Sequence, residues 1–94
     1  MYLITEVCFH SGKRKGLPLS GYRPDIIVNN GQEEYWGISF AELDVQDFGI
    51  LVYAKAKFTF QESHYGEVEV GQTFKIMEGA RQVGIGTIVS IEKD

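Results

Sequence analysis

Apolar and polar residues alternate with a period of two along most of the chain, and no segment carries a sustained helical stripe. In residues 2–10 this alternation gathers Leu3, Thr5, Val7 and Phe9 on one face. A β-strand points successive side chains to opposite faces, so a period of two is typical of strands. The pattern therefore predicts an all-β protein.

Five further runs predict strands, and most are bounded by turn-forming residues. They cover residues 25–28, 35–40, 50–61, 73–78 and 82–92. Residues 41–49 have no clear period, so we expect a loop there. Without a helix to cover a sheet face, six strands bury their apolar sides most economically in a closed barrel or a sandwich.

The alternation also predicts which residues share a face. The fourth run puts Ala54, Ala56, Phe58 and Phe60 together, and the fifth points Phe74 and Ile76 inward. The last run groups Val83, Ile85, Thr87, Val89 and Ile91. Gly84 and Gly86 then fall on the outward face, where a missing side chain marks a bend or the close approach of another backbone.

Length and charge restrict the class of protein. The 94 residues amount to one domain, residues 1–94, which is too small for a GTPase, a kinase or a Rossmann enzyme. A net charge of −4 is the opposite of what a general nucleic-acid binder carries. With a single cysteine, no signal-peptide pattern and no apolar run of about 18 residues, we expect a cytoplasmic protein without a membrane span.

Two motifs have a recognisable form. The first is Gly21-Tyr22-Arg23-Pro24, and the second is Phe74-x-Ile76-x-Glu78-Gly79-x-Arg81-x-Val83-Gly84-x-Gly86-x-Ile88. Together with Glu6-Val7 and the charged loop before Gly21, they resemble the C-terminal barrel of translation elongation factor Tu and related translational GTPases, over essentially the whole chain. The resemblance implies a closed six-stranded antiparallel β-barrel. In the full factor this barrel packs on the GTP-binding domain, touches the T stem of aminoacyl-tRNA and contacts the exchange factor.

The chain also departs from that family. It has no G-x-x-x-x-G-K-[ST] phosphate loop, so this sequence lacks the residues that bind the nucleotide phosphates for hydrolysis in that family. Asp25 follows the first motif where the family commonly has glutamine, and Glu33 and Glu34 come where the family has an Arg-Thr-Thr stretch near the tRNA. Because acids weaken binding to a phosphate backbone, we expect the chain on its own to bind neither GTP nor aminoacyl-tRNA with useful affinity.

The matched motifs define a candidate partner-binding surface, which consists of Tyr22, Arg23, Glu78, Arg81, Gly84 and Gly86. The alternative is that each arginine pairs with a nearby acid such as Glu78 or Asp25 to fix a strand end, while Glu78 is simply solvated. In the family, neighbouring surface is buried against other domains. An isolated copy must therefore cover this patch with a protein partner or as a homo-oligomer, or have made it polar.

Other clusters carry weaker signals. The basic loop, Lys13, Arg14 and Lys15, either meets an anionic surface or is merely exposed. Cys8 and His10 lie two apart, about 7 Å along a strand and beyond hydrogen-bond reach. With only the remote His64 to join them they do not form a closed metal site. We expect no metal, no cofactor and no catalytic residue.

Tyr35-Trp36 with Tyr53 and Tyr65 are the remaining candidates. Trp36 and Tyr53 either form an exposed aromatic anchor for a partner or, as for most aromatics in a small barrel, fill the core. Taken together, the sequence favours a non-catalytic binding module that acts through protein contacts, as an accessory to translation. A residual tRNA- or ribosome-binding factor is the alternative, and an enzyme has least support.

Overall fold

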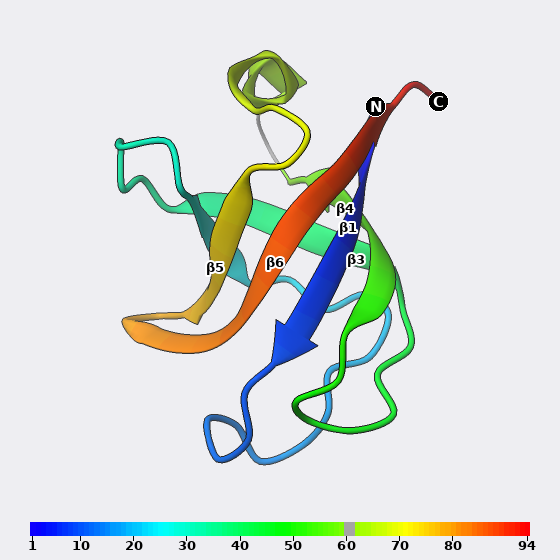
Figure 1. Ribbon diagram of the computed structural model, residues 1–94, viewed down its shortest axis with the longest axis vertical. Coiled ribbons are helices and arrows are strands. Elements are labelled where there is room, and N and C mark those ends of the chain that lie inside the picture. Colours follow the sequence, from blue (N-terminus) through cyan, green and yellow to red (C-terminus); the bar gives the residue numbers. More distant parts are fainter. Residues whose placement is uncertain (60–61) are drawn as a thin grey trace.

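A computed structural model describes residues 1–59 and 62–94 (Figure 1). Its elements are β1 (Tyr2–Phe9), β2 (Asp25–Val28), β3 (Trp36–Leu43), β4 (Val52–Phe58), the 3-10 helix η1 (Glu62–Glu67), β5 (Thr73–Glu78) and β6 (Arg81–Glu92). The strands close into a barrel in the order β1-β4-β3-β2-β5-β6, and β1 pairs antiparallel with both β4 and β6. The predicted closed six-stranded antiparallel β-barrel is therefore confirmed, and a sandwich is excluded.

The core forms as the alternation predicts in the regular strands. Leu3, Thr5, Val7 and Phe9 are fully buried along β1. The Thr5 hydroxyl, a polar group inside the barrel, donates to the Ala54 carbonyl oxygen at 2.9 Å, so its burial leaves no unpaired donor. The inward positions of β4 and β5 are also as predicted, and they are Ala54, Ala56, Phe58, Phe74 and Ile76. Phe60 lies outside the described residues.

The prediction that residues 41–49 are all loop was wrong at its start. Strand β3 continues through Ala41 and Glu42 to Leu43, which is buried. A β-bulge between Phe40 and Glu42 leaves two successive residues exposed and thereby breaks the period of two. Because the period of two is interrupted there, the sequence pattern did not indicate that the strand continues.

The predicted face of β6 was also wrong. Its register shifts twice, once opposite Ile76/Met77 and once opposite Ile4/Thr5. Each shift adds a residue to β6 and reverses the faces beyond it. Ile85 and Val89 are consequently 45% and 39% exposed. The buried positions of this strand are Val83, Gly84, Gly86 and Ile88.

The two glycines of β6 therefore face inward, not outward. A Cβ atom on Gly86 would lie 2.2 Å from Cζ of the Phe74 ring, which occupies the space that a side chain would need. A Cβ atom on Gly84 would lie 2.7 Å from the backbone oxygen of Cys8. The close approach expected at these positions exists, but it involves the core and the neighbouring strand.

Aromatic side chains close the end of the barrel beside η1. Trp36 is buried and stacks on His64, with ring centroids 3.9 Å apart. The Tyr65 hydroxyl accepts the Phe58 N–H at 3.1 Å. Core filling is thus the role of Trp36 and Tyr65, and the anchor formed by Trp36 with Tyr53 was wrong, although Tyr53 itself is 68% exposed. No helix among the described residues is long and apolar enough to span a membrane.

A two-residue turn joins β5 and β6 into a hairpin. Glu78 pairs with Arg81 across a two-residue loop. Gly79 has a φ of 62°, whereas Ala80 is not in the left-handed region. Positive φ at the first central position only is the signature of a type II′ turn. The hairpin tip lies at the end of the barrel away from η1 and the chain termini (Figure 1).

Candidate functional site

The Gly-Tyr-Arg-Pro motif brings an aromatic ring over the end of the barrel that is remote from η1. Gly21 has a φ of 92°, which glycine adopts without steric cost, and its N–H donates to the Phe40 carbonyl at 2.8 Å. The turn sets the Tyr22 ring against Phe40, stacked at 6.0 Å, and against Phe9, edge-on at 5.9 Å. Tyr22 therefore has one side in the core and its hydroxyl at the surface.

At the surface, side chains from both motifs and from the basic loop meet. The Tyr22 hydroxyl donates to Oε2 of Glu78, and Nε of Arg14 donates to the same oxygen at 2.8 Å. The Arg14 guanidinium also lies over the Tyr22 ring, 4.9 Å from its centroid. Nη1 of Arg81 donates to the Lys13 carbonyl at 2.9 Å. We refer to Arg14, Tyr22, Glu78 and Arg81 as the barrel-end cluster.

The electrostatics of this cluster favour a charged Glu78 and a neutral Tyr22. Burial alone would raise the pKa of Glu78, but hydrogen bonds from Tyr22 and Arg14, and the charges of Arg14 and Arg81, outweigh burial and lower it. Burial, followed by the hydrogen bond to Glu78 and the charge of Glu78, raises the pKa of Tyr22 well above its ordinary value. Tyr22 thus serves as a neutral hydrogen-bond donor at neutral pH.

The expected pairing of the two motif arginines with acids is not what the fold contains. Glu78 pairs with Arg14 of the basic loop, and it is not a merely solvated residue. Arg81 binds a backbone carbonyl, while Arg23 is exposed and makes no ion pair with another described residue. The ion pair that ties down the loop thus joins residues 64 positions apart.

The cluster leaves a cationic surface around it. Lys13, Lys15, Arg23 and Arg81 are exposed, and within residues 1–59 and 62–94 none forms a salt bridge. Acidic side chains lie nearby in the chain segment that follows β3. A backbone bridge between Leu19 and Asp44 joins this segment to the stretch of chain between loop 11–16 and Tyr22. Loop 11–16 and the segment that follows β3 both lie at the bottom of Figure 1. This end of the barrel therefore combines the exposed cations of loop 11–16 and the hairpin with the exposed acids Asp44 and Asp47.

Gly84 and Gly86 do not belong to this surface. Both are buried in the wall of the barrel, so the expectation that they are exposed to a partner was wrong. The sequence motif that contains them combines two roles. Glu78 and Arg81 act at the surface, and the glycines make room for Phe74 and for the backbone of β1.

The cysteine and the two histidines remain apart. Cys8 and His10 are half-buried near the end of β1, whereas His64 lies in η1 at the other end of the barrel (Figure 1). Nδ1 of His64 is buried and has no hydrogen-bond partner among residues 1–59 and 62–94, with Oε2 of Glu67 at 3.7 Å. In the described part of the chain, no three His, Cys, Asp or Glu side chains are arranged to hold a metal ion.

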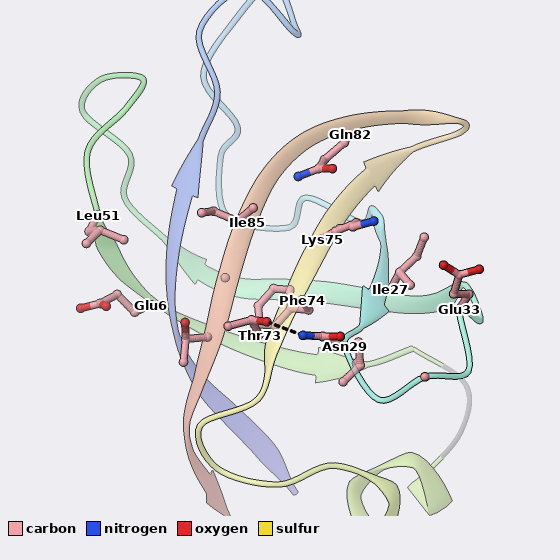
Figure 2. Close-up of a pocket in the computed structure, with 14 residues that line it drawn as sticks. Glu6, Ile27, Asn29, Glu33, Leu51, Thr73, Phe74, Lys75, Gln82 and Ile85 are labelled. Carbon is pink, nitrogen blue, oxygen red and sulfur yellow. Dashed lines mark hydrogen bonds between the residues drawn. The ribbon is translucent and has the colours of Figure 1, made fainter.

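A cavity of about 560 Å³ on the side wall is a feature that the sequence analysis missed. It lies over β5 and β6, between the β2–β3 connection and β1 (Figure 2). Its lining side chains come from segments far apart in the chain, and the strand register alone brings them together. No motif or local spacing could have indicated it.

No family model matches the sequence, and a search of curated proteins finds no match. The fold and the barrel-end cluster define the protein as a small all-β barrel with an ordered, partly cationic end.

Proposed function

We propose that the protein is a non-catalytic binding module that acts through contacts with a protein partner, as an accessory to translation in the cytoplasm. The observation that carries this proposal is the barrel-end cluster. Arg14 and Arg81 tie loop 11–16 to the β5–β6 hairpin, and so they hold exposed cations on an ordered backbone. An ordered surface loses less conformational entropy when a partner binds.

The charges indicate the chemistry of the partner. Lys13, Lys15 and Arg23 have no acidic partner within the described residues, so they are free to meet carboxylates of another protein. Leu19 is 76% exposed, and its carbonyl accepts the Tyr22 N–H at 3.0 Å, so it adds an apolar group to the turn that carries Arg23. Complementary charge mainly raises the association rate and the specificity. We therefore propose an acidic protein surface as the partner.

The proposal includes kinship with the C-terminal barrel of elongation factor Tu. In its support, the two motifs that carry the resemblance meet in one hydrogen bond, from Tyr22 to Glu78, although these residues are 56 positions apart. This hydrogen bond explains physically why the Gly-Tyr-Arg-Pro and Glu-Gly-x-Arg segments occur in the same chain. Surface residues that bond to each other across the two motifs support the proposal that this surface binds a partner.

A tRNA- or ribosome-binding role is the alternative, because the same cations suit phosphates. Asp44 and Asp47 disfavour it, since they follow β3 at the same end of the barrel. A long polyanion would run from the cationic part onto these acids, whereas a protein partner can match both parts with charges of opposite sign. This mixed pattern is the reason for preferring a protein.

Affinity capture from the source cell at ~0.15 M salt, with and without nuclease, tests the proposal. We expect the wild-type protein to retain a nuclease-insensitive protein partner, and the Lys13→Glu/Lys15→Glu/Arg23→Glu variant to lose it. The matched control is Lys55→Glu/Lys57→Glu/Lys93→Glu, which changes the net charge equally. Recovery of tRNA, or equal retention by both variants, would contradict the proposal.

A further inference from the structure

The side-wall cavity has the size and position of a binding groove. Ligand sites commonly enclose ~300–1,000 Å³, and this one encloses about 560 Å³. Figure 2 shows Leu51 and Glu6 at one side of it and Ile27 and Glu33 at the other, with Lys75 between them. Its lining includes no residue of the barrel-end cluster and none of the exposed cations near it.

The register of the strands builds the floor of this groove from two rows of outward side chains. In the first row Ile27 of β2 pairs with Lys75 of β5, which pairs with Ile85 of β6. In the second row the short side chains of Thr73 and Thr87 pair, and Thr87 pairs in turn with Glu6 of β1. The first row offers apolar contacts beside a cation, and the second is low enough to admit a ligand.

Three charged side chains line the groove without a charged partner. Lys75, Glu6 and Glu33 form no salt bridge within residues 1–59 and 62–94. Lys75 lies between the two carboxylates and nearer to Glu33 than to Glu6 (Figure 2). The complementary ligand is therefore elongated, with a negative group between two positive ends.

We propose that this groove binds a short extended peptide segment of a partner protein. The segment places an acidic side chain at Lys75 and basic side chains toward Glu6 and Glu33, and the aliphatic parts of these side chains pack against Ile27 and Ile85. From β2 to β1 the order β2-β5-β6-β1 spans three strand spacings. At about 4.8 Å per spacing and about 3.3 Å per extended residue, roughly four to six peptide residues cross it. A compact small molecule would leave one of the carboxylates unmatched.

A nitrogen-15 NMR titration of the full chain tests this with two pentapeptide probes, Ac-Lys-Val-Glu-Val-Lys-NH2 and its charge-inverted form Ac-Glu-Val-Lys-Val-Glu-NH2. In an extended peptide the three charged side chains of each probe share one face. We expect the first probe to shift the amide signals of Thr73, Ile85 and Thr87 and to bind about fivefold or more tightly than the inverted probe, since exposed charge pairs are individually weak. In the Glu6→Lys/Glu33→Lys/Lys75→Glu variant, the preference between the two probes should reverse. Equal binding of both probes, or no groove shifts with either, would overturn the proposal.

Two tryptophan substitutions on β6 test the location. Thr87→Trp fills the groove and should abolish binding of the first probe, whereas Val89→Trp, on the same strand but outside the lining, should leave it unchanged. The dispersed amide spectrum of each variant reports whether the barrel is intact. Loss of binding in the Val89→Trp variant alone would refute the assignment. The Lys13→Glu/Lys15→Glu/Arg23→Glu variant should still bind the probe, so this test is independent of the barrel-end proposal.

Discussion

Gly86 is the position where a single methyl group should reveal the inward geometry of β6. A Cβ atom there would lie 2.2, 2.5 and 2.9 Å from three carbons of the Phe74 ring, and Phe74 is itself buried in the core. Overpacking of a core typically costs about 1–3 kcal/mol, while the gain from restricting the unfolded chain is only about 0.4–1 kcal/mol. We therefore expect Gly86→Ala to lower the free energy of unfolding by about 2 kcal/mol.

Urea denaturation of the purified chain measures this loss. Gly66→Ala is the control, because no atom of the described residues lies within 4 Å of a Cβ atom built on Gly66. It should change stability by less than about 0.5 kcal/mol. In the Phe74→Leu background the cost of Gly86→Ala should fall by about 1 kcal/mol or more, since residues in contact couple by such amounts. A Gly86→Ala variant as stable as the wild type, or a cost independent of Phe74, would refute the reasoning.

Three further outcomes concern the barrel-end cluster and its ligands. Because the pKa of Glu78 is lower in the folded than in the unfolded state, ionised Glu78 stabilises the fold above its unfolded-state pKa. This stability is lost as pH falls through the folded-state pKa. Glu78→Gln should therefore flatten the acid side of a curve of unfolding free energy against pH, and an unchanged acid side would contradict this. Tyr22→Phe should destabilise by about 1 kcal/mol in thermal or urea unfolding, and it should raise the pKa of Glu78 when that is measured by NMR; a pKa of Glu78 that stays unchanged would exclude the hydrogen bond. Fluorescence titration at ~0.15 M salt should detect no specific binding of GTP or aminoacyl-tRNA by the chain alone, and micromolar, aminoacylation-dependent binding would instead favour the translation-factor alternative.

The regular strands could be predicted from the sequence because their burial is a local property. Successive residues of β1 alternate between core and surface, so the period of two is visible in the amino-acid sequence. In β6 the same alternation fails at Val83 and Val89, where the bulges add a residue. A bulge depends on the partner strand and leaves no signal within its own strand. The inward position of Gly84 and Gly86 was therefore hidden.

The sequence predicted which residues belong to the candidate site, but not which of them contact each other. Tyr22, Glu78 and Arg81 stand in motifs, and Arg14 stands in a charge run. Their contacts join a loop to a hairpin across 56 to 68 positions, and such distances carry no local pattern. Arg14 was consequently assigned to an exposed loop, and its ion pair with Glu78 was missed. The side-wall groove was missed for the same reason, since it exists only through strand register.

Site-specific photo-crosslinking in the source cell tests the central claim, that the cationic end of the barrel contacts a protein. A benzoyl-phenylalanine introduced in place of Lys15 should give a discrete adduct with another protein, resistant to nuclease. The same probe in place of Lys93, an exposed lysine outside the barrel-end surface, should give no such adduct. Adducts with RNA at residue 15, or the same protein adduct at both positions, would contradict the account.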